Sequence, residues 1–431
     1  MMPTPRITFS KLTQKQAVAA VARHEMLYAG RMGGARAVFA FCDLSGLDLS
    51  GRNLADADFT GAILEETNFA DARLESASFF GADLRRANLT AASLRRADMR
   101  GACLRGANLI GADLYEADLR EGTIAEKDRF GNLRVMQHDV GPSEATSALL
   151  NSANLERAKM TGAIAVQADF TDAIMRGCRL ARANLRQANF TGANLENADL
   201  TGCNLTGADM TGAILVGART SCAIFDGVDL STALTEQPAG REISKLGVPI
   251  ADVLEAHFRW VETDGREGNP ADLSGLDLRE LKNLAHRSLT ALIAPGATLY
   301  GLDLQGVSLQ GSNLQGADLR ATKLAGADLR GANLSGARLS NADLHDAKLG
   351  PLMLSDARLL PTRLDGAQVR YADLRGADLR RACLTETDLA YANLGDADLR
   401  DTDLGSAILT GAKLPITVME TIPSLAVASS A

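Results

Sequence analysis

The hydrophobic pattern of this chain repeats every five residues over most of its length. From Leu299 to Leu414 every fifth residue is a leucine, except Val369, and a small residue such as Ala327 stands two positions before it. Residues five apart lie roughly 140° apart around an α-helix, so a helix would scatter the leucines over all its sides. Five is an odd number, so a flat strand would turn successive leucines to opposite faces. The chain must therefore bend once per five residues, which predicts a narrow β-solenoid with the leucines on its axis and no interruption between 299 and 414.

The repeated motif is A(D/N)LXX, as in GADLR at 316–320 and GANLS at 331–335. It resembles the repeat of the pentapeptide repeat family over residues 39–414, with interruptions. This resemblance implies an all-β solenoid, a right-handed quadrilateral β-helix in which four pentapeptides form one coil of twenty residues. It implies little about activity, because the family is defined by its backbone.

Two segments have helical patterns and are expected to cap solenoid ends. Residues 13–30 have Thr13 as N-cap and Gly30 as stop, and residues 248–265 carry a matching apolar stripe when His257 is aligned with His24. The heptapeptide DLSGLDL follows each helix, at 43–49 and 272–278. This pattern predicts a duplicated unit of cap helix plus solenoid, with both histidines on the capping faces, bonded to carbonyls of the coil edge or, in the alternative, binding a ligand.

The pentapeptide register is displaced by one residue between the first and second blocks, and TIAEKDRFGNLRVMQHDV lies between them. Its strand-like runs around residues 128–132 predict a β-hairpin inserted into the coil. A projecting tip with charge and an aromatic ring is a candidate protein-binding site, so the hairpin provides four candidate residues: Lys127, Arg129, Phe130 and Arg134. In the alternative, Phe130 folds back as a staple on the solenoid wall and the junction around Trp260 becomes the candidate.

These patterns divide the chain into seven segments. They are a cap region at 1–36, a first solenoid block at 37–124, the inserted hairpin at 125–148, a second block at 149–233, a linker with the second cap helix at 234–271, a third block at 272–414 and a tail at 415–431.

Stacking residues twenty apart predicts the columns of the solenoid. Two aromatic columns are expected in the core: Phe39, Phe59, Phe79 with Met99, and Phe170, Phe190 with Met210. On the surface, charges should alternate in the column Asp303, Lys323, Asp343 and Arg363. Asp378 and Asp398 stack as like charges, but Arg380 and Arg400 stand two residues further on and should neutralise them, so no metal site is predicted there.

The cysteines, the histidines and the motifs of the chain argue against a metal site, a redox site or an active site. The six cysteines have no metal or redox spacing, and Cys178 and Cys203 stand at small inward positions. The histidines lie far apart in sequence, and no nucleophile elbow, phosphate loop or H-E-x-x-H is present. We therefore expect neither catalysis nor a cofactor. The net charge of −8 disfavours direct nucleic-acid binding, and no apolar run is long enough for a membrane span, so a cytoplasmic location is expected.

The leading hypothesis is a non-enzymatic scaffold that binds another protein of unknown identity, with a homodimer left open. The alternative comes from the resemblance, because Qnr and MfpA type members imitate B-DNA and bind DNA gyrase. B-DNA carries one negative charge per about 1.7 Å. Six coils at about 4.8 Å would span roughly 29 Å and would need about 17 negative charges to match it. Residues 299–414 hold 15 acidic and 13 basic residues, so charge disfavours DNA mimicry.

Overall fold

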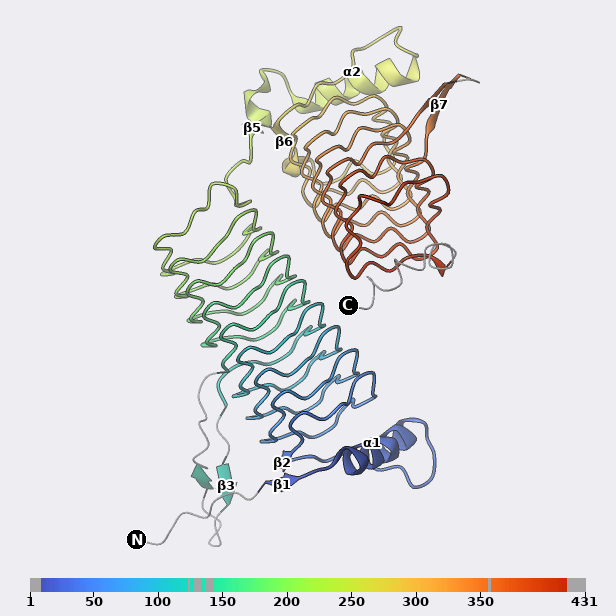
Figure 1. The fold of residues 1–431 in the computed structure, drawn as a ribbon. Helices are drawn as coiled ribbons and strands as arrows, with labels where there is room; N and C mark the ends of the chain where they lie inside the picture. Colours follow the sequence, from blue (N-terminus) through green and yellow to red (C-terminus); the bar gives the residue numbers. More distant parts are fainter. Residues whose placement is uncertain (1–8, 123–124, 128–132, 136–142, 356–357, 417–431) are drawn as a thin grey trace. The chain divides into compact units, whose positions relative to one another are not determined.

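The computed structural model describes residues 9–122, 125–127, 133–135, 143–355 and 358–416. The chain folds as two compact units, Met1–Gln237 and Pro238–Ala431 (Figure 1). Each unit is a stack of coils, in which single residues pair in parallel with the residue one coil further on, usually twenty positions away. The bend predicted for each pentapeptide is present, because the second residue after most core leucines has a positive φ, as at Gly51 (64°) and Asp56 (57°). The β-solenoid predicted from the repeat is therefore confirmed.

Inside the coils, leucine and alanine fill the axis as the period predicts. Leu329 and Ala327 are fully buried, and the amide of Leu329 donates to the carbonyl of Lys348 in the next coil at 2.8 Å. Both aromatic columns are also present. The rings of Phe59 and Phe79 stack with centroids 4.9 Å apart, as do those of Phe170 and Phe190, and Phe69 packs edge-on against Phe59.

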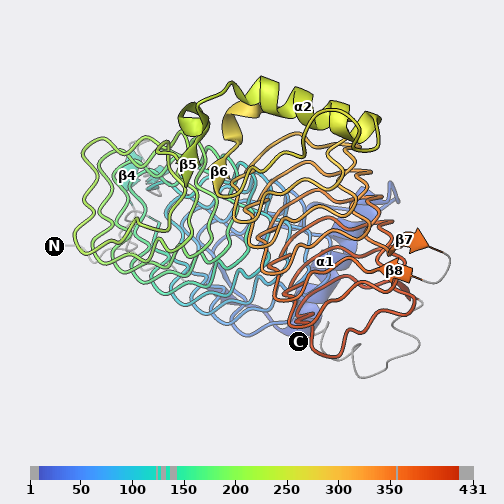
Figure 2. The same ribbon diagram turned by 90° about the horizontal axis from the view of Figure 1, so that it is seen from above.

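Each unit begins with a short strand, a helix and a first coil. In unit 1 these are β1 (Ser10–Lys11), α1 (Gln14–Tyr28) and β2 (Cys42–Asp43); in unit 2 they are β5 (Arg241–Glu242), the 3-10 helix η1 (Ile243–Leu246), α2 (Ile250–Glu262), β6 (Leu276–Asp277) and the 3-10 helix η2 (Arg279–Leu281). Strand β1 pairs in parallel with β2, and β5 pairs in parallel with β6. Figure 1 shows α1 across the first coil of unit 1, and Figure 2 shows α2 along the first coil of unit 2.

The two caps correspond, but not through the heptapeptide DLSGLDL. The paired strands make Cys42 equivalent to Leu276, whereas the heptapeptide would align Asp43 with Asp272. The sequence match is thus displaced by one pentapeptide, because any two stretches of the repeat look alike. The residues expected to be a linker also take part in unit 2, since β5 and η1 lie within 234–247.

The first insertion is an antiparallel pair, β3 (Ala125–Lys127) with β4 (Leu133–Val135). Below it Asp98 pairs with Asp118 twenty residues on, whereas Asp118 pairs with Lys159, 41 residues on, so 21 residues leave the coil. The coil resumes at Ser143, six residues before the expected boundary at 149. That segment was missed because Ala145, buried at 2% exposure, occupies a leucine position.

The prediction of an uninterrupted array from 299 to 414 is wrong. Strands β7 (Leu352–Ser355) and β8 (Arg358–Leu360) form a second antiparallel hairpin that leaves unit 2. Across it Asn333 pairs with Arg363, thirty residues on, so ten residues are looped out. Ten residues are two pentapeptides, so the five-residue spacing of the leucines continues unchanged across the hairpin. Leu354 and Leu359 therefore look like core residues in the sequence, although they are 50% and 41% exposed.

This hairpin also changes the surface columns. Asp303, Lys323 and Asp343 stack as predicted, but the next member is Asp373, and the prediction of Arg363 is wrong. The prediction for Asp378 and Asp398 is confirmed: they stack, and Arg380 and Arg400 each form an ion pair with the aspartate two residues before, at 2.8 and 2.6 Å.

Candidate interaction surfaces

The neck of the first insertion carries an unusual order of charges. In one surface column Asp98 and Asp118 stack below the insertion, and Lys159 and Arg179 stack above it. The insertion therefore brings two acidic and two basic residues into one line. A second column, at the preceding turn of each coil, adds Arg96, Glu116 and Arg157.

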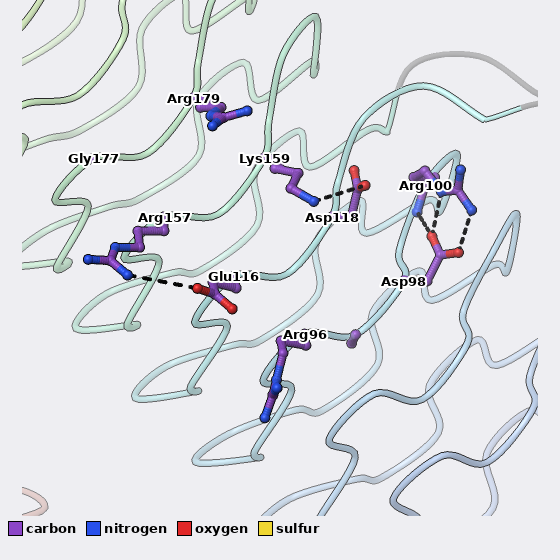
Figure 3. A pocket seen from close by; sticks show the side chains of 10 residues that line it. Arg96, Asp98, Arg100, Glu116, Asp118, Arg157, Lys159, Gly177 and Arg179 are labelled. Atoms are coloured by element: carbon purple, nitrogen blue, oxygen red, sulfur yellow. Dashed lines mark hydrogen bonds and ion pairs between the residues drawn. The ribbon is translucent and has the colours of Figure 1, made fainter.

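Between the two columns lies an open groove of about 730 Å³ (Figure 3). Its charged lining is formed by five basic and three acidic side chains: Arg96, Arg100, Arg157, Lys159, Arg179, Asp98, Glu116 and Asp118. All three carboxylates face a cation within the groove, because Arg100 contacts Asp98 at 2.6 Å, Arg157 contacts Glu116 at 3.9 Å and Lys159 contacts Asp118 at 4.0 Å.

The remaining cations of the groove are Arg96 and Arg179, both exposed. Within the described residues neither forms an ion pair. The groove lining thus has two more basic than acidic side chains, in a chain whose net charge is −8. Many other surface charges are compensated locally, in several cases by an arginine that reaches back to the aspartate two residues before it, as Arg330 does to Asp328 at 2.6 Å.

The sequence-predicted site residues lie in two places. Lys127 belongs to β3 and Arg134 to β4, opposite Leu133 and Glu126 respectively, in the hairpin that leaves the coil beside the groove. Arg129 and Phe130 lie outside the described residues. Trp260 lies on α2, half-buried, and its ring stacks on His257 with centroids 5.9 Å apart. Trp260 is therefore part of a cap in unit 2, and the hairpin residues belong to unit 1.

Hairpin β7–β8 presents a second surface, which the sequence did not reveal. Figures 1 and 2 show it projecting from the coils of unit 2. Leu352 and Leu360 stand opposite each other and rest on Gly331, where an added Cβ would lie 2.7 Å from Leu352 and 3.1 Å from Leu360. Their neighbours on the hairpin expose apolar side chains: Met353 at 67%, Leu354 at 50% and Leu359 at 41%.

One group of metal-type ligands occurs among the described residues: Asp343, His345 and Asp373, whose ligand atoms lie within 4.8 Å of one another. The hairpin creates it by placing Asp373 on Asp343. Its charges are compensated, however, because Arg375 contacts Asp373 at 2.5 Å and His345 Nδ1 lies 2.6 Å from Asp343. The hydrogen bond to Asp343 raises the pKa of His345, so this imidazole serves as the partner of Asp343.

The buried cysteines are structural. The Sγ of Cys203 lies 2.8 Å from the carbonyl oxygen of Leu180, and Cys178 is fully buried. Burial raises the pKa of Cys203 to about 11 and that of Cys178 further, so neither is a thiolate near neutral pH. Within the described residues, no helix combines the length and apolar character that a membrane crossing needs.

Comparison with known proteins agrees with this geometry. The family model for pentapeptide repeats matches eight times, at residues 42–81, 53–90, 82–121, 145–177, 178–217, 193–231, 312–350 and 382–415. No curated protein sequence matches the chain.

Among solved structures, a pentapeptide repeat protein from the thylakoid lumen of Arabidopsis thaliana is 34% identical over 26% of this chain and 64% of its own length, with a TM-score of 0.20. Rfr23 from the cyanobacterium Cyanothece 51142 is 27% identical over 32% of this chain and 91% of its own, with a TM-score of 0.24. HetL from Nostoc sp. strain PCC 7120, a protein involved in heterocyst differentiation regulation, is 23% identical over 92% of this chain and 96% of its own, with a TM-score of 0.15.

The family model covers more than half of the chain, the matched segments are the coils of both units, and the coils repeat every twenty residues. This chain therefore belongs to the pentapeptide repeat family.

Proposed function

We propose that this protein is a non-enzymatic scaffold that binds another protein, and that an acidic segment of this partner occupies the groove at the neck of the first insertion. The observation that carries the proposal is a pair of arginines in the groove lining, Arg96 and Arg179, which are exposed and form no ion pair among the described residues. Cations that are not paired within the protein are available to a partner's carboxylates, and complementary charge increases both the association rate and the specificity of binding.

The position of the groove supports the proposal. Hairpin β3–β4 leaves the coil directly after the strand position of Asp118, so a partner that lies in the groove would also reach the hairpin. The hairpin strands β3 and β4 contain Lys127 and Arg134, together with Glu126. Repetitive walls offer few distinctive contacts, whereas a groove with an adjacent projecting loop can supply both charge and shape.

A DNA-mimicking function like that of the Qnr type is the less favoured candidate. DNA mimicry requires uncompensated negative charge along the surface. Here the stacked aspartates are commonly held in two-pronged contacts by arginines of the same strand, as Arg85 contacts Asp83 at 2.6 Å and Arg400 contacts Asp398 at 2.6 Å.

The test uses the intact protein as bait in extracts of the cells that produce it. Three baits are compared: the wild type, the groove variant Arg96→Glu with Arg179→Glu, and the control variant Arg23→Glu with Arg31→Glu, which makes the same charge change on exposed positions of the α1 region. We expect a partner that is captured by the wild type and the control but lost with the groove variant. Binding should also weaken with salt. Equal capture by all three baits would remove the groove as the site, and topoisomerase subunits as the dominant catch would favour DNA mimicry.

The hairpin is tested separately by replacing residues 123–142 with a short Gly/Ser link. This range leaves Ser143 and the coil after it intact. Loss of capture without loss of thermal stability would place part of the binding site on the hairpin.

A further inference from the structure

The two caps share one buried contact. His24 on α1 and His257 on α2 are both completely buried. The Nδ1 of His24 accepts a hydrogen bond from the amide of Ala37 at 3.1 Å, and the Nδ1 of His257 accepts one from the amide of Ala271 at 3.0 Å. These alanines are the inward small residues that open the first coil of each unit. At Nδ1 the expectation that the histidines bond to edge carbonyls is wrong, because the edge presents an N–H at this position and the ring must accept.

This contact requires a neutral imidazole. An Nδ1 that accepts has no proton, so the proton of the neutral ring is on Nε2. The Nε2 of His257 is buried without a hydrogen-bond partner among the described residues, and the Nε2 of His24 is also buried, in a ring on which the Ala55 carbonyl acts. A second proton would go to Nδ1 and would place two N–H groups against each other at about 3 Å, in a site that also excludes water.

We propose that His24 and His257 are proton-sensitive latches, and that each cap detaches from its first coil when its histidine is protonated. The latch is a property of the fold and does not depend on the proposed binding function.

The surroundings of both rings determine the direction in which the pKa of each histidine is shifted. Burial lowers the pKa of His24, and the Ala55 carbonyl and the carboxylates of Asp56 and Glu25 partly offset this effect, while Arg36 adds to it. The Tyr28 ring packs on the His24 ring, and its hydroxyl, whose pKa is raised to about 12, stays neutral. Burial alone lowers the pKa of His257, whose ring stacks on that of Trp260 and lies 6.5 Å from that of Phe258.

These pKa shifts determine how the docking of the caps depends on pH. In both caps the pKa of the docked histidine lies below that of the exposed one. The exposed form therefore binds protons more readily, so docking is complete above about pH 6.5 and weakens as the pH falls below it.

The caps should not open together, because α1 is held by more polar contacts. The side chain of Gln14 donates to the carbonyl of Asp48 at 2.6 Å and accepts from the amide of Asp48 at 2.9 Å, so it pairs with this backbone as a strand residue would. Glu25 forms a two-pronged ion pair with Arg52 at 2.7 and 2.9 Å, and the Tyr28 hydroxyl donates to Ala55 at 2.9 Å. At the corresponding point of α2, Phe258 replaces Glu25 and receives Arg287 over its ring at 5.5 Å. We expect α2 to open first.

Opening would expose the edge of the first coil. In unit 1 the cap covers this edge through β1, since Leu12 donates to the carbonyl of Asp43 at 2.9 Å. A bare edge of this kind offers a row of backbone donors and acceptors to another strand. The latches would thus make access to the coil ends depend on pH.

The test is hydrogen exchange of the full chain, measured by mass spectrometry at pH 7.5 and 5.0 and corrected for the intrinsic exchange rates. Amides of α2 and Ala271 should exchange roughly tenfold faster at pH 5.0, and those of α1 should respond less. Amides of the inner coils, such as Leu329, should not change. The variants His24→Asn and His257→Asn keep an acceptor at the place of Nδ1 but do not titrate, so the pH response of the corresponding cap should disappear.

Two results would overturn the proposal: equal protection of both caps at the two pH values, or an unchanged pH response in the asparagine variants. A measurement on the wild type covers the case in which a variant folds poorly. Histidine ring signals followed by NMR between pH 7.5 and 5.0 should show protonation of His257 together with the loss of protection in α2. A protonated ring under a helix that remains protected would refute the latch.

Discussion

The side-chain oxygen of Thr362 lies 3.0 Å from the carbonyl oxygen of Gly350 and 3.0 Å from that of Leu329. Thr362 thereby closes the neck of hairpin β7–β8, where Gly350 is the point of departure and Leu329 belongs to the coil below. Ser143 closes the first insertion in the same way, with Oγ 3.0 Å from the carbonyls of Arg120 and Met99. A hydroxyl at the small inward position thus lets each hairpin leave without breaking the stack.

The first prediction tests this neck. Thr362→Val removes an oxygen that also accepts from the buried amide of Gly331 at 2.9 Å. The amide would be left without an acceptor, and we expect the free energy of unfolding of unit 2 to fall by about 1–3 kcal/mol. Thermal or urea unfolding measures the change. Thr385→Val, at an exposed position of the same unit, is the control and should change stability by less than about 0.5 kcal/mol.

The second prediction separates the sequence register from the structure. Leu329 and Leu359 occupy the same phase of the repeat, but Leu329 is fully buried and Leu359 is 41% exposed on the hairpin. Leu329→Arg would bury an unpaired charge and should unfold unit 2. Leu359→Arg should leave the melting temperature nearly unchanged. Equal effects of both substitutions, seen by circular dichroism, would contradict the looped-out hairpin.

The third prediction concerns the two units. Fragments 1–237 and 238–431 should each fold alone with β-rich circular dichroism, because each contains its own cap and core. A shorter fragment, 248–431, lacks β5 and should be less stable than 238–431, since the coil edge at Leu276 then loses its parallel strand. A disordered 238–431 fragment would show that unit 2 depends on unit 1.

The fourth prediction concerns a buried ion pair in unit 2. Asp318 is 3% exposed and contacts Arg320 at 2.7 Å and Arg338 at 2.9 Å. Burial alone would raise the pKa of Asp318, but the hydrogen bond and charge of Arg320, with Arg338, hold the pKa below its ordinary value. The stabilisation is therefore present above about pH 4 and lost as the pH falls further.

Removing the charge tests the same pair at neutral pH. Asp318→Asn should destabilise unit 2 by about 3–5 kcal/mol, because it removes the buried carboxylate that Arg320 and Arg338 share. Asp398→Asn changes a more exposed pair and should cost about 0–1 kcal/mol. Similar losses for both variants, measured by urea unfolding, would show that burial does not decide the strength of these pairs.

The fifth prediction addresses the tip of the first hairpin. Combining Arg129→Ala with Phe130→Ala should leave folding intact and abolish capture of the partner if the tip binds. If the ring is a staple, the melting temperature should fall and capture should persist at temperatures where the protein is folded. Wild-type capture together with wild-type stability would remove both roles.

The sequence by itself determined the coil, because a five-residue period fits neither a helix nor a flat strand and forces a bend at every repeat. It also located α1, with Thr13 as its N-cap, and the hairpin whose 21 residues shift the register. A shift that is not a multiple of five is visible in the leucine pattern.

The tertiary structure decided what the period conceals. Hairpin β7–β8 removes ten residues, a multiple of five, so nothing in the phase distinguishes Leu359 from Leu329 until the stacking partners are known. The same degeneracy displaced the comparison of the two caps by one pentapeptide and misplaced the neighbour of Asp343. The groove with Arg96 and Arg179 was hidden for a related reason, since its columns are set by how many residues leave the coil at each neck. Because the pentapeptides are nearly identical, the sequence determines the conformation of each one, and only the stacking of the coils determines which pentapeptides are neighbours.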